Sequence, residues 1–286
     1  MFSIISKEAG GAELTYRFAL KQKEKFCLAI SGPAIKIFKK KFNKIKIISK
    51  SEAIKKSDWV LCSTGTSSDF EKDGIILAKK NKKKVIVILD HWVEYRSRFL
   101  KNKKLFLPNE IWVTDNHALK IVKKENFKTK IILKKNLFFD EFRKKAKLFK
   151  QTKKNKNSGK KIIFLSEWVN PMHKKGYNGE QCLKFFLDNL PALKLKIDKI
   201  SIRFHPQEKI KKIKWLNNYS SKILISKNKH IFDDILQHDI IVGINTVALV
   251  LGLIAKKKVI SCIPTKKNKC DLNYKKILDF KKIKNI

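Results

Sequence analysis

Short apolar runs alternate with segments of helical spacing along almost the whole chain, and this alternation is what most constrains the fold. Strands that alternate with helices favour parallel sheets joined by right-handed crossovers. The chain is therefore expected to be an α/β protein. The expected strands are residues 2–6, 26–30, 45–48, 59–63, 85–89, 110–113 and 131–133 in the first half, and 162–165, 200–204, 223–225, 240–242 and 259–262 in the second.

One stretch without any apolar residue divides the pattern into two halves. Residues 151–161 read QTKKNKNSGKK, and the alternation restarts directly after them. We predict a Rossmann-like N-terminal domain over residues 1–150, a linker over 151–161 and a Rossmann-like C-terminal domain over 162–286, whose last segment, 272–286, is expected to be helical. The two domains should face each other across a cleft. Ligands of open α/β sheets bind beyond the carboxyl ends of strands, so chemistry is expected in the loops that follow them.

The net charge of +42 suggests at first a nucleic-acid partner, but the kind of basic residue argues against it. Of 67 basic residues only five are arginines, the residue that bidentate reading of guanine and phosphate favours, and the lysines are spread over the whole chain. Abundant Lys, Ile and Asn are typical of an AT-rich genome. We therefore do not expect nucleic acid as a partner, although contact with an anionic membrane surface stays open.

Cysteine usage and segment length favour a cytoplasmic protein, at most peripheral on the inner face of the membrane. The five cysteines are widely spaced and form no CxxC pair, so no zinc site is expected. The longest apolar stretch, residues 240–255, contains glycine, asparagine and threonine and is too short to span a bilayer. No secretory signal is visible after Met1.

A glycine pair follows the first expected strand, in the segment SKEAGGAE over residues 6–13. Paired glycines before a helix let a ligand approach the backbone and the helix N-terminus, which favours anions. Gly10 and Gly11 are therefore candidates for binding an acceptor, and Glu8 is a candidate general base for an acceptor hydroxyl. A tight strand-to-helix turn without a ligand would explain the same residues.

The segment after strand 85–89 reads DHWVEYRSRF over residues 90–99 and is unusually polar for a connection. Two of the five arginines lie in it, at the carboxyl end of a strand. We interpret it as a segment for acceptor recognition or catalysis, with Asp90 as a second candidate base. The alternative is an amphipathic helix with its aromatic residues packed inward and its charges paired outside. The acceptor-binding candidates here are His91, Glu94, Arg96 and Arg98.

Two segments of the second half carry features suited to a phosphate. His205 and Pro206 follow a strand, where an imidazole could bind or protonate a phosphate. Asn245 and Thr246 follow another strand, and are expected to cap the next helix and to present backbone N–H groups to an anion. Arg203 ends the strand before His205 and is expected, with Asn245 and Thr246, to hold the phosphate. Ordinary helix capping and a capped loop histidine would explain these residues without a ligand.

These two segments together resemble a known family. A strand followed by HPxE, a short DDIL helix and then DIIVGxNTxAL is similar to the donor half of GT-B glycosyltransferases, above all the bacterial sialyl-, polysialyl- and Kdo-type transferases and the CDP-glycerol-type polymerases. In that group an HP motif and a Ser/Thr-rich turn hold the nucleotide phosphate of the donor. The resemblance implies this role for His205, Pro206 and Thr246, whereas Asn245 departs from the more usual serine. The motif matches span about residues 200–262.

The resemblance extends to two further loops by their place in the fold. The loop that begins with Ser166 and Glu167 corresponds to one that faces the donor, so both are candidate donor contacts. The glycine loop with Glu8 is similar in place to the acceptor-side loop, where such enzymes often carry the base. No DxD motif precedes a suitable strand, so the resemblance implies a metal-independent enzyme without a cofactor, whose nucleotide sugar is a substrate.

The leading hypothesis is thus a glycosyltransferase acting on a cell-envelope glycan or a lipid-linked acceptor. Glu8 would deprotonate the acceptor, with Asp90 as its substitute, and His205 would bind or protonate the donor phosphate. A second hypothesis is a UDP-sugar 2-epimerase-like enzyme, in which Asp90, His91 and Glu94 act on the sugar ring. A third, from a different class, is a polyanion-binding or nucleic-acid-binding protein driven by the positive charge.

Overall fold

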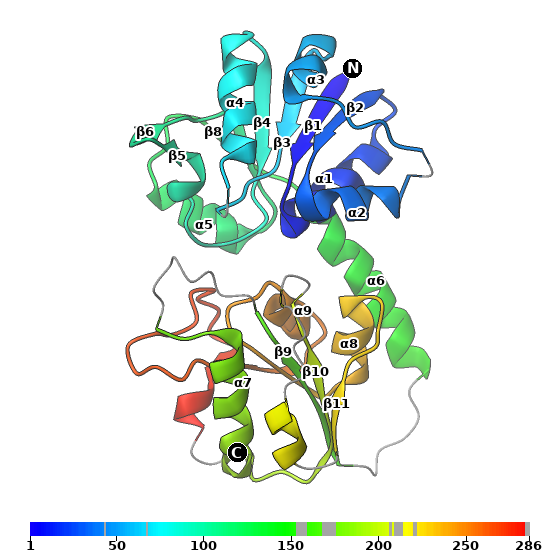
Figure 1. Cartoon of the computed structure of the whole chain (residues 1–286), viewed down its shortest axis with the longest axis vertical. Helices are drawn as coiled ribbons and strands as arrows, with labels where there is room; N and C mark the ends of the chain where they lie inside the picture. Colours follow the sequence, from blue (N-terminus) through cyan, green and yellow to red (C-terminus); the bar gives the residue numbers. More distant parts are fainter. Residues whose placement is uncertain are drawn as a thin grey trace. The chain divides into compact units, whose positions relative to one another are not determined.

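The computed structural model describes residues 1–42, 44–66, 68–152, 159–167, 176–205, 208, 214–219 and 222–283. The chain forms two compact units, Met1–Asp140 and Glu141–Ile286. Each contains one six-stranded sheet in which every pair of neighbouring strands is parallel, with helices packed against it (Figure 1). The predicted α/β fold with two parallel-sheet domains is confirmed.

The sheet of the N-terminal unit has the order β2-β1-β3-β4-β7-β8. Strand β1, next to the edge strand β2, is buried at every position, because α1 and α2 pack on one face of the sheet and α3 and α4 on the other. The strands are β1 (Phe2–Ser6), β2 (Phe26–Ile30), β3 (Trp59–Cys62), β4 (Lys84–Ile88), β7 (Glu110–Val113) and β8 (Lys130–Leu133); the helices are α1 (Ala9–Lys21), α2 (Gly32–Lys39), α3 (Lys50–Lys56), α4 (Phe70–Lys80) and α5 (Asn116–Lys124).

The order of these strands places a topological switch point between β1 and β3. The chain passes from β1 to β2 on one side and then crosses to β3 on the other, so the loops after β1 and β3 diverge to opposite faces. Ligands of open α/β sheets bind where the strand order reverses. The loops that follow β1 and β3 are therefore the place to look for a site in this unit.

The predicted strand over residues 45–48 is wrong. This segment contributes only one isolated bridge, between Leu28 and Ile47, beside the edge strand β2. Its apolar side chains stay partly or fully exposed, and Ile47 is 38% exposed. Burial against a neighbouring layer normally stabilises a strand of this kind, and here it is only partial. An antiparallel hairpin, β5 (Leu100–Lys101) with β6 (Lys104–Leu105), lies outside the sheet.

The sheet of the C-terminal unit has the order β11-β10-β9-β12-β13-β14, with its switch point between β9 and β12. Helix α7 packs on one face of this sheet, while α9 packs on the other, with its Gly252 against β12 and β13. The strands are β9 (Lys160–Leu165), β10 (Ile197–Arg203), β11 (Ile223–Ile225), β12 (Ile240–Gly243), β13 (Lys258–Ser261) and β14 (Ile277–Asp279); the helices are α7 (Gly179–Asp188), α8 (Ile231–Gln237) and α9 (Ala248–Ile254).

The predicted helix over residues 272–286 is also wrong within its described part. Residues 277–279 form the edge strand β14, parallel to β13, and a 3-10 turn follows at Phe280–Lys282. Phe280 packs into the core of this unit, against Phe186 of α7. Pairing with the open edge of β13 and this aromatic contact outweigh the weak helical pattern.

The predicted linker, residues 151–161, falls in three different places. Residues 151 and 152 end helix α6 (Leu137–Thr152), and residues 160 and 161 begin β9. Residues 153–158 lie outside the described part of the chain. The division between the two compact units lies between Asp140 and Glu141, inside α6.

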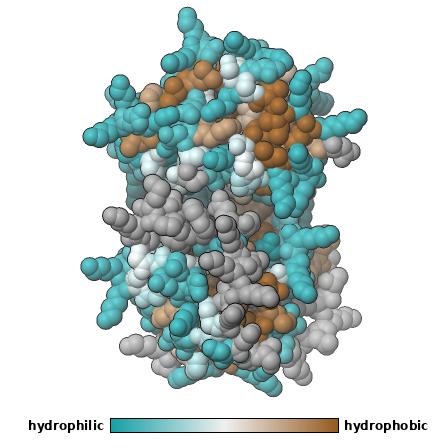
Figure 2. All heavy atoms as spheres, in the orientation of Figure 1, coloured by the Kyte–Doolittle hydropathy of each residue, from teal (hydrophilic) through white to brown (hydrophobic). Residues whose placement is uncertain are grey.

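The surface of the described residues is mostly hydrophilic on the face drawn in Figure 2, with smaller apolar patches between the polar side chains. Hydrophilic side chains cover both units there and are not gathered in one segment. None of the helices in the described ranges combines the length and the apolar composition that a membrane crossing requires.

Candidate active site

The loop after β1 carries Glu8, and helix α1 starts at once behind it. The sequence placed the two glycines in a turn before the helix, but α1 begins at Ala9, so Gly10 and Gly11 belong to its first turn and Glu8 is the N-cap residue. A Cβ atom on Gly10 would lie less than 3.0 Å from Oδ2 of Asp90, and one on Gly11 equally close to the side chain of Ser63. Glycine is required because the first turn of α1 lies directly against the ends of β3 and β4.

Asp90, two residues beyond β4, forms an ion pair with Arg98. The Nη1 atom of Arg98 lies 3.2 Å from Oδ1 of Asp90 and donates a hydrogen bond of 2.9 Å to Oγ1 of Thr64. Both charged side chains are largely buried, with Arg98 8% and Asp90 12% exposed. Burial raises the pKa of the Asp90 carboxyl, and Arg98 acts in the opposite direction.

The sequence left two alternatives open for the segment 90–99, a polar segment for recognition or catalysis and an amphipathic helix, and in the structure the segment has features of both. Its aromatic residues Trp92, Tyr95 and Phe99 are buried, as the amphipathic-helix alternative required, but the backbone makes bends and one 3-10 turn (Ser97–Phe99) instead of a helix. The Nε atom of Arg98 donates to the carbonyl oxygen of Val93 at 3.2 Å, which fixes the guanidinium inside the turn. The segment is thus a packed loop that presents one buried ion pair at the strand ends.

The predicted acceptor-binding residues of this segment are not all brought together. Arg98 joins Asp90, whereas Arg96 is exposed and its Nη2 donates to the carbonyl oxygen of Glu125 at 2.8 Å, at the end of α5. Glu94 is exposed, with a positive φ of 59°, and His91 is half-buried. Of the predicted acceptor set, Arg98 and the glycine turn of α1 therefore lie next to Asp90.

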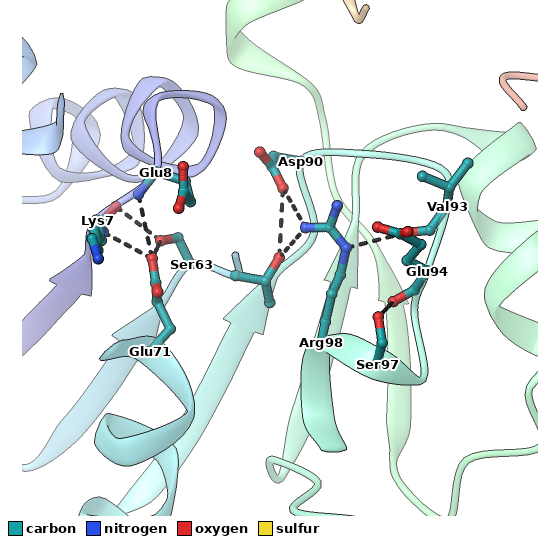
Figure 3. Close-up of polar contacts among 11 residues, drawn as sticks. Lys7, Glu8, Ser63, Glu71, Asp90, Val93, Glu94, Ser97 and Arg98 are labelled. Atoms are coloured by element: carbon teal, nitrogen blue, oxygen red, sulfur yellow. Dashed lines mark hydrogen bonds and ion pairs between the residues drawn. The ribbon is translucent and has the colours of Figure 1, made fainter. Parts of the chain in front are cut away.

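Glu71 belongs to this site, and the sequence analysis missed it. It lies in the first turn of α4, is 2% exposed, and its Oε1 atom accepts hydrogen bonds from the N–H groups of Lys7 at 2.8 Å and Glu8 at 3.4 Å. Oγ of Ser63 lies 3.3 Å from the same oxygen. Figure 3 shows Glu71 reaching from α4 to the loop that carries Glu8, with Asp90 and Arg98 beside it. Burial raises the pKa of Glu71, although the N–H groups of Lys7 and Glu8 oppose this.

A sequence signal for Glu71 did exist. The buried residues of α4 are Glu71, Gly74, Ile75 and Ala78, which are spaced as the core-facing stripe of an amphipathic helix. A carboxylate on that stripe is unusual, because burying a charge without partners is costly. A carboxylate on the apolar stripe of a predicted helix is therefore a sequence signal for a candidate site residue.

In the C-terminal unit, the loops after β9 and β12 meet at the second switch point. The backbone N–H of Asn245 donates to Oε2 of Glu167 at 2.7 Å. The Asn245 side chain is buried and binds Asp271: its Nδ2 donates to the carboxylate, and its Oδ1 accepts from the Asp271 N–H at 2.8 Å. The prediction that Asn245 caps α9 is wrong, because Val247 is the N-cap residue and Asn245 instead anchors the loop at Asp271. Thr246 does accept a bond from the Ala248 N–H, at 3.3 Å.

Ser166 and His205 are linked through one carboxylate that the sequence analysis did not single out. Oγ of Ser166 donates to Oε1 of Glu208 at 2.8 Å, and the His205 N–H donates to Oε2 of the same residue at 2.7 Å. Glu208 is the last residue of the HPxE motif. The motif's Pro206 lies outside the described residues.

Arg203, at the end of β10, is engaged inside the C-terminal unit. Its Nη1 donates to Oδ2 of Asp234 at 2.6 Å and to the carbonyl oxygen of Asn228 at 2.9 Å. Asp234 is fully buried and also accepts from Ser226 and from the Asn228 side chain. The guanidinium thus ties the end of β10 to the first turn of α8, and its predicted contact with a donor phosphate stays a prediction. Within the described ranges, no cluster of His, Cys, Asp and Glu has the arrangement of a metal site.

Three solved structures resemble the chain over nearly its whole length. The UDP-GlcNAc 2-epimerase from Methanocaldococcus jannaschii is 14% identical, with a TM-score of 0.57 over 91% of this chain and 83% of that one. The glycotransferase of kitacinnamycin is 10% identical, with a TM-score of 0.53 over 95% and 82%. A variant of the wall teichoic acid polymerase TagF is 11% identical, with a TM-score of 0.51 over 91% and 69%. No protein-family model matches the chain, and no curated protein matches its sequence.

These structures share the two-domain GT-B fold, so the fold that the sequence resemblance implied is confirmed. At identities of 10–14% the likeness extends to the fold alone. The narrower resemblance to the sialyl-, Kdo- and CDP-glycerol-type group, and the role of its HP motif, stay predictions.

Proposed function

We propose that the chain is a glycosyltransferase that moves a sugar from a nucleotide-activated donor to a hydroxyl of a cell-envelope glycan or lipid-linked acceptor. The observation that carries the proposal is the meeting of Glu8, Asp90 and the glycine turn of α1 at the strand ends of the N-terminal sheet. Two carboxylates beside the start of a helix offer an acceptor for the proton of a sugar hydroxyl.

In the proposed reaction Glu8 is the general base. The acceptor oxygen attacks the anomeric carbon, the bond from that carbon to the donor phosphate breaks, and the acceptor proton passes to the Glu8 carboxylate. Asp90 is less suited to this step, because burial raises its pKa and Arg98 already occupies its Oδ1 atom. Its proposed part is to orient the acceptor together with Arg98, and it stays the substitute base.

The donor half of the proposal places the nucleotide phosphate at the strand ends of the C-terminal sheet. The Asn245 N–H already binds one anionic oxygen, that of Glu167, so a phosphate oxygen in its place would find the same donor. We propose that His205 stabilises or protonates the leaving phosphate, with Ser166 and Thr246 as further contacts. Lysine, histidine and backbone groups would supply the positive potential without a metal ion.

A second candidate is a 2-epimerase-like activity on the donor sugar itself. Two observations favour it: the fold likeness to a UDP-GlcNAc 2-epimerase, and the raised pKa of Asp90, which burial causes and to which the charge of Glu8 adds. Two carboxyl groups in different environments can serve as acid and base on one sugar ring. Incubation with the nucleotide sugar alone separates the two activities, because an epimerase converts it without an acceptor.

The first experiment is a thermal-shift panel with CMP, CDP, UDP, GDP and dTDP, with and without magnesium. A ligand that binds only the folded state raises the unfolding temperature by mass action. We expect one nucleotide to give a metal-independent shift that His205→Ala abolishes, whereas His117→Ala, in α5 of the other unit, retains it. If no nucleotide gives a shift, the proposal is wrong, and salt-sensitive binding of RNA or DNA would then favour the polyanion-binding hypothesis.

A further inference from the structure

Glu71 occupies a position where a carboxylate is costly and where the proposed reaction gives it no part. It lies on the core-facing stripe of α4, among Gly74, Ile75 and Ala78, and is 2% exposed. An apolar residue there would bury more favourably, so the carboxyl group has to be explained by what it contacts. Those contacts lead to the loop that carries Glu8.

One oxygen of Glu71 organises that loop. Oε1 accepts from two consecutive backbone N–H groups, those of Lys7 and Glu8, and lies 3.3 Å from Oγ of Ser63 at the end of β3. Backbone N–H groups at the start of a helix have no partner within the helix. Glu71 therefore supplies the acceptor that fixes the backbone on either side of the proposed base (Figure 3).

The other oxygen of Glu71 is buried and has no hydrogen-bond partner among the residues that the structure describes. Oε2 faces Gly65, in the loop after β3: a Cβ atom on Gly65 would lie 3.4 Å from it. The same point lies 3.3 Å from Oε1 of Glu8. A side chain at Gly65 would therefore contact both carboxyl groups, so the two approach the same point of this loop. An ionised Oε2 here would be desolvated and would face a second carboxylate, whereas a protonated Oε2 would be a donor facing an acceptor.

We propose that Glu71 and Glu8 share one proton, held on Oε2 of Glu71 and directed at the Glu8 carboxylate, so that Glu71 is a positioning residue for the base. This inference rests on the proposed function only for the role of Glu8 as base. The sharing of a proton by Glu71 and Glu8 is tested independently of that function. The proton on Glu71 stays in place through the reaction. Glu8 takes the acceptor proton and later releases it to solvent, so the pair carries one negative charge before each turnover.

The charged and titratable groups around Glu71 are compatible with a protonated carboxyl. Cys62 of β3 donates its thiol to the Glu71 backbone oxygen at 3.6 Å, and its own pKa is raised well above the ordinary value by burial and by Glu71. Lys50 of α3 binds the Phe70 carbonyl oxygen at 3.1 Å and contacts Asp73, so its charge is directed at other oxygens. Burial raises the pKa of Glu71, the loop N–H groups lower it, and the charge of Glu8 raises it with a smaller effect than these.

The test is a carboxyl titration by ¹³C NMR on full-length protein labelled at glutamate, in the unaltered chain and in Glu71→Gln and Glu8→Gln. We expect one glutamate signal to titrate above the ordinary range, to be absent in Glu71→Gln, and to move toward the ordinary range in Glu8→Gln because its charged partner is gone. Asp69→Asn, at the exposed N-cap position of the same helix, should leave that signal unchanged. If every glutamate titrates in the ordinary range, or if Glu8→Gln leaves the raised signal where it was, the proposal is overturned.

A second readout concerns turnover and uses the same variant. Glutamine at position 71 keeps an acceptor for the loop N–H groups and places an N–H donor where the proposed O–H lies, so Glu71→Gln mimics the protonated side chain. With kcat measured against pH, Glu71→Gln should lower kcat less than Glu71→Ala, which also removes the acceptor for the loop N–H groups, and should lose the titration of Glu71 on the alkaline side. If a folded Glu71→Gln protein loses as much kcat as Glu71→Ala, the positioning role of the protonated carboxyl is overturned. If neither the unaltered chain nor these variants turn over any donor but the titration behaves as expected, the proposed function fails and the proton-sharing pair stands.

Discussion

Replacing Arg98 by methionine removes the cation beside Asp90 and keeps most of the apolar length of the side chain. The two side chains are 8% and 12% exposed, and Nη1 of Arg98 also holds Thr64 at 2.9 Å. Removing one partner of a buried ion pair costs about 3–5 kcal/mol, because an uncompensated charge stays behind. We expect Arg98→Met to lower the free energy of unfolding of the N-terminal unit by about 3 kcal/mol at neutral pH.

The cost of Arg98→Met should depend on pH in a defined direction. Burial raises the pKa of Asp90 in the folded protein above its value in the unfolded chain, even with Arg98 present. The folded state therefore binds more protons between the two pKa values, so this carboxyl lowers stability as the pH rises through that window. Without Arg98 the folded pKa rises further. The destabilisation should be smallest below the unfolded pKa, where Asp90 is protonated in both states, and should grow toward neutral pH.

Urea unfolding at several pH values, followed by tryptophan fluorescence, measures the free energy of unfolding of each variant. Trp92 is a suitable probe because it is buried in the same segment as Arg98. Arg96→Met is the matched control: Arg96 lies two residues away, its side chain is 56% exposed and its pair with Glu125 is at the surface, where such pairs contribute about 0–1 kcal/mol. Adding Asp90→Asn to Arg98→Met should recover much of the loss. If Arg98→Met costs no more than Arg96→Met at neutral pH, or costs the same at pH 4 and pH 8, the buried pair is not the source of the stability.

Three further predictions concern glycine packing, a buried aspartate and the donor site. Gly10→Ala should destabilise the N-terminal unit by about 1–3 kcal/mol in urea unfolding, despite the better helix propensity of alanine, because its Cβ would collide with Asp90; a stabilised variant would contradict the close packing. Asp234→Ala should cost the C-terminal unit about 3 kcal/mol, since it leaves Arg203 without its carboxylate, and a cost below about 1 kcal/mol would show that this network is dispensable. His205→Ala should abolish the nucleotide-induced thermal shift and leave the unfolding temperature without nucleotide nearly unchanged; a retained shift would remove His205 from the donor site.

The fold class could be predicted from sequence because buried parallel strands are short apolar runs with polar loops at their ends. The prediction of strands from apolar runs failed for two segments, because the burial of these segments depends on residues that are distant in sequence. Residues 45–48 are as apolar as the observed strands, but at the edge of the sheet they are at most partly buried and make only one bridge. Residues 277–279 form a strand because β13 offers an open edge, which no local pattern reveals.

The candidate site was predictable in part for the same reason. Glu8 and Asp90 follow strands, and the carboxyl ends of parallel strands meet at one edge, so both could be named before the structure was known. The burial of Arg98 could not be predicted from the sequence, because it depends on a turn in which Trp92, Tyr95 and Phe99 are buried. Nor could sequence show that Gly10 lies against Asp90, since the strand order places β1 two positions from β4.

The acidic residues of this chain carry more information about its sites than the basic ones. With 67 basic and 25 acidic residues, a further surface lysine changes little, whereas each carboxylate is set against a strongly positive background. Burying a carboxylate is costly wherever it occurs, so composition alone does not account for Glu71, Asp90 or Asp234. Each of the three is fixed by named hydrogen bonds at or beside the carboxyl end of a strand, where parallel sheets bind their ligands. In a lysine-rich α/β chain, a buried carboxylate at a strand end is therefore a stronger indication of a functional site than the net charge.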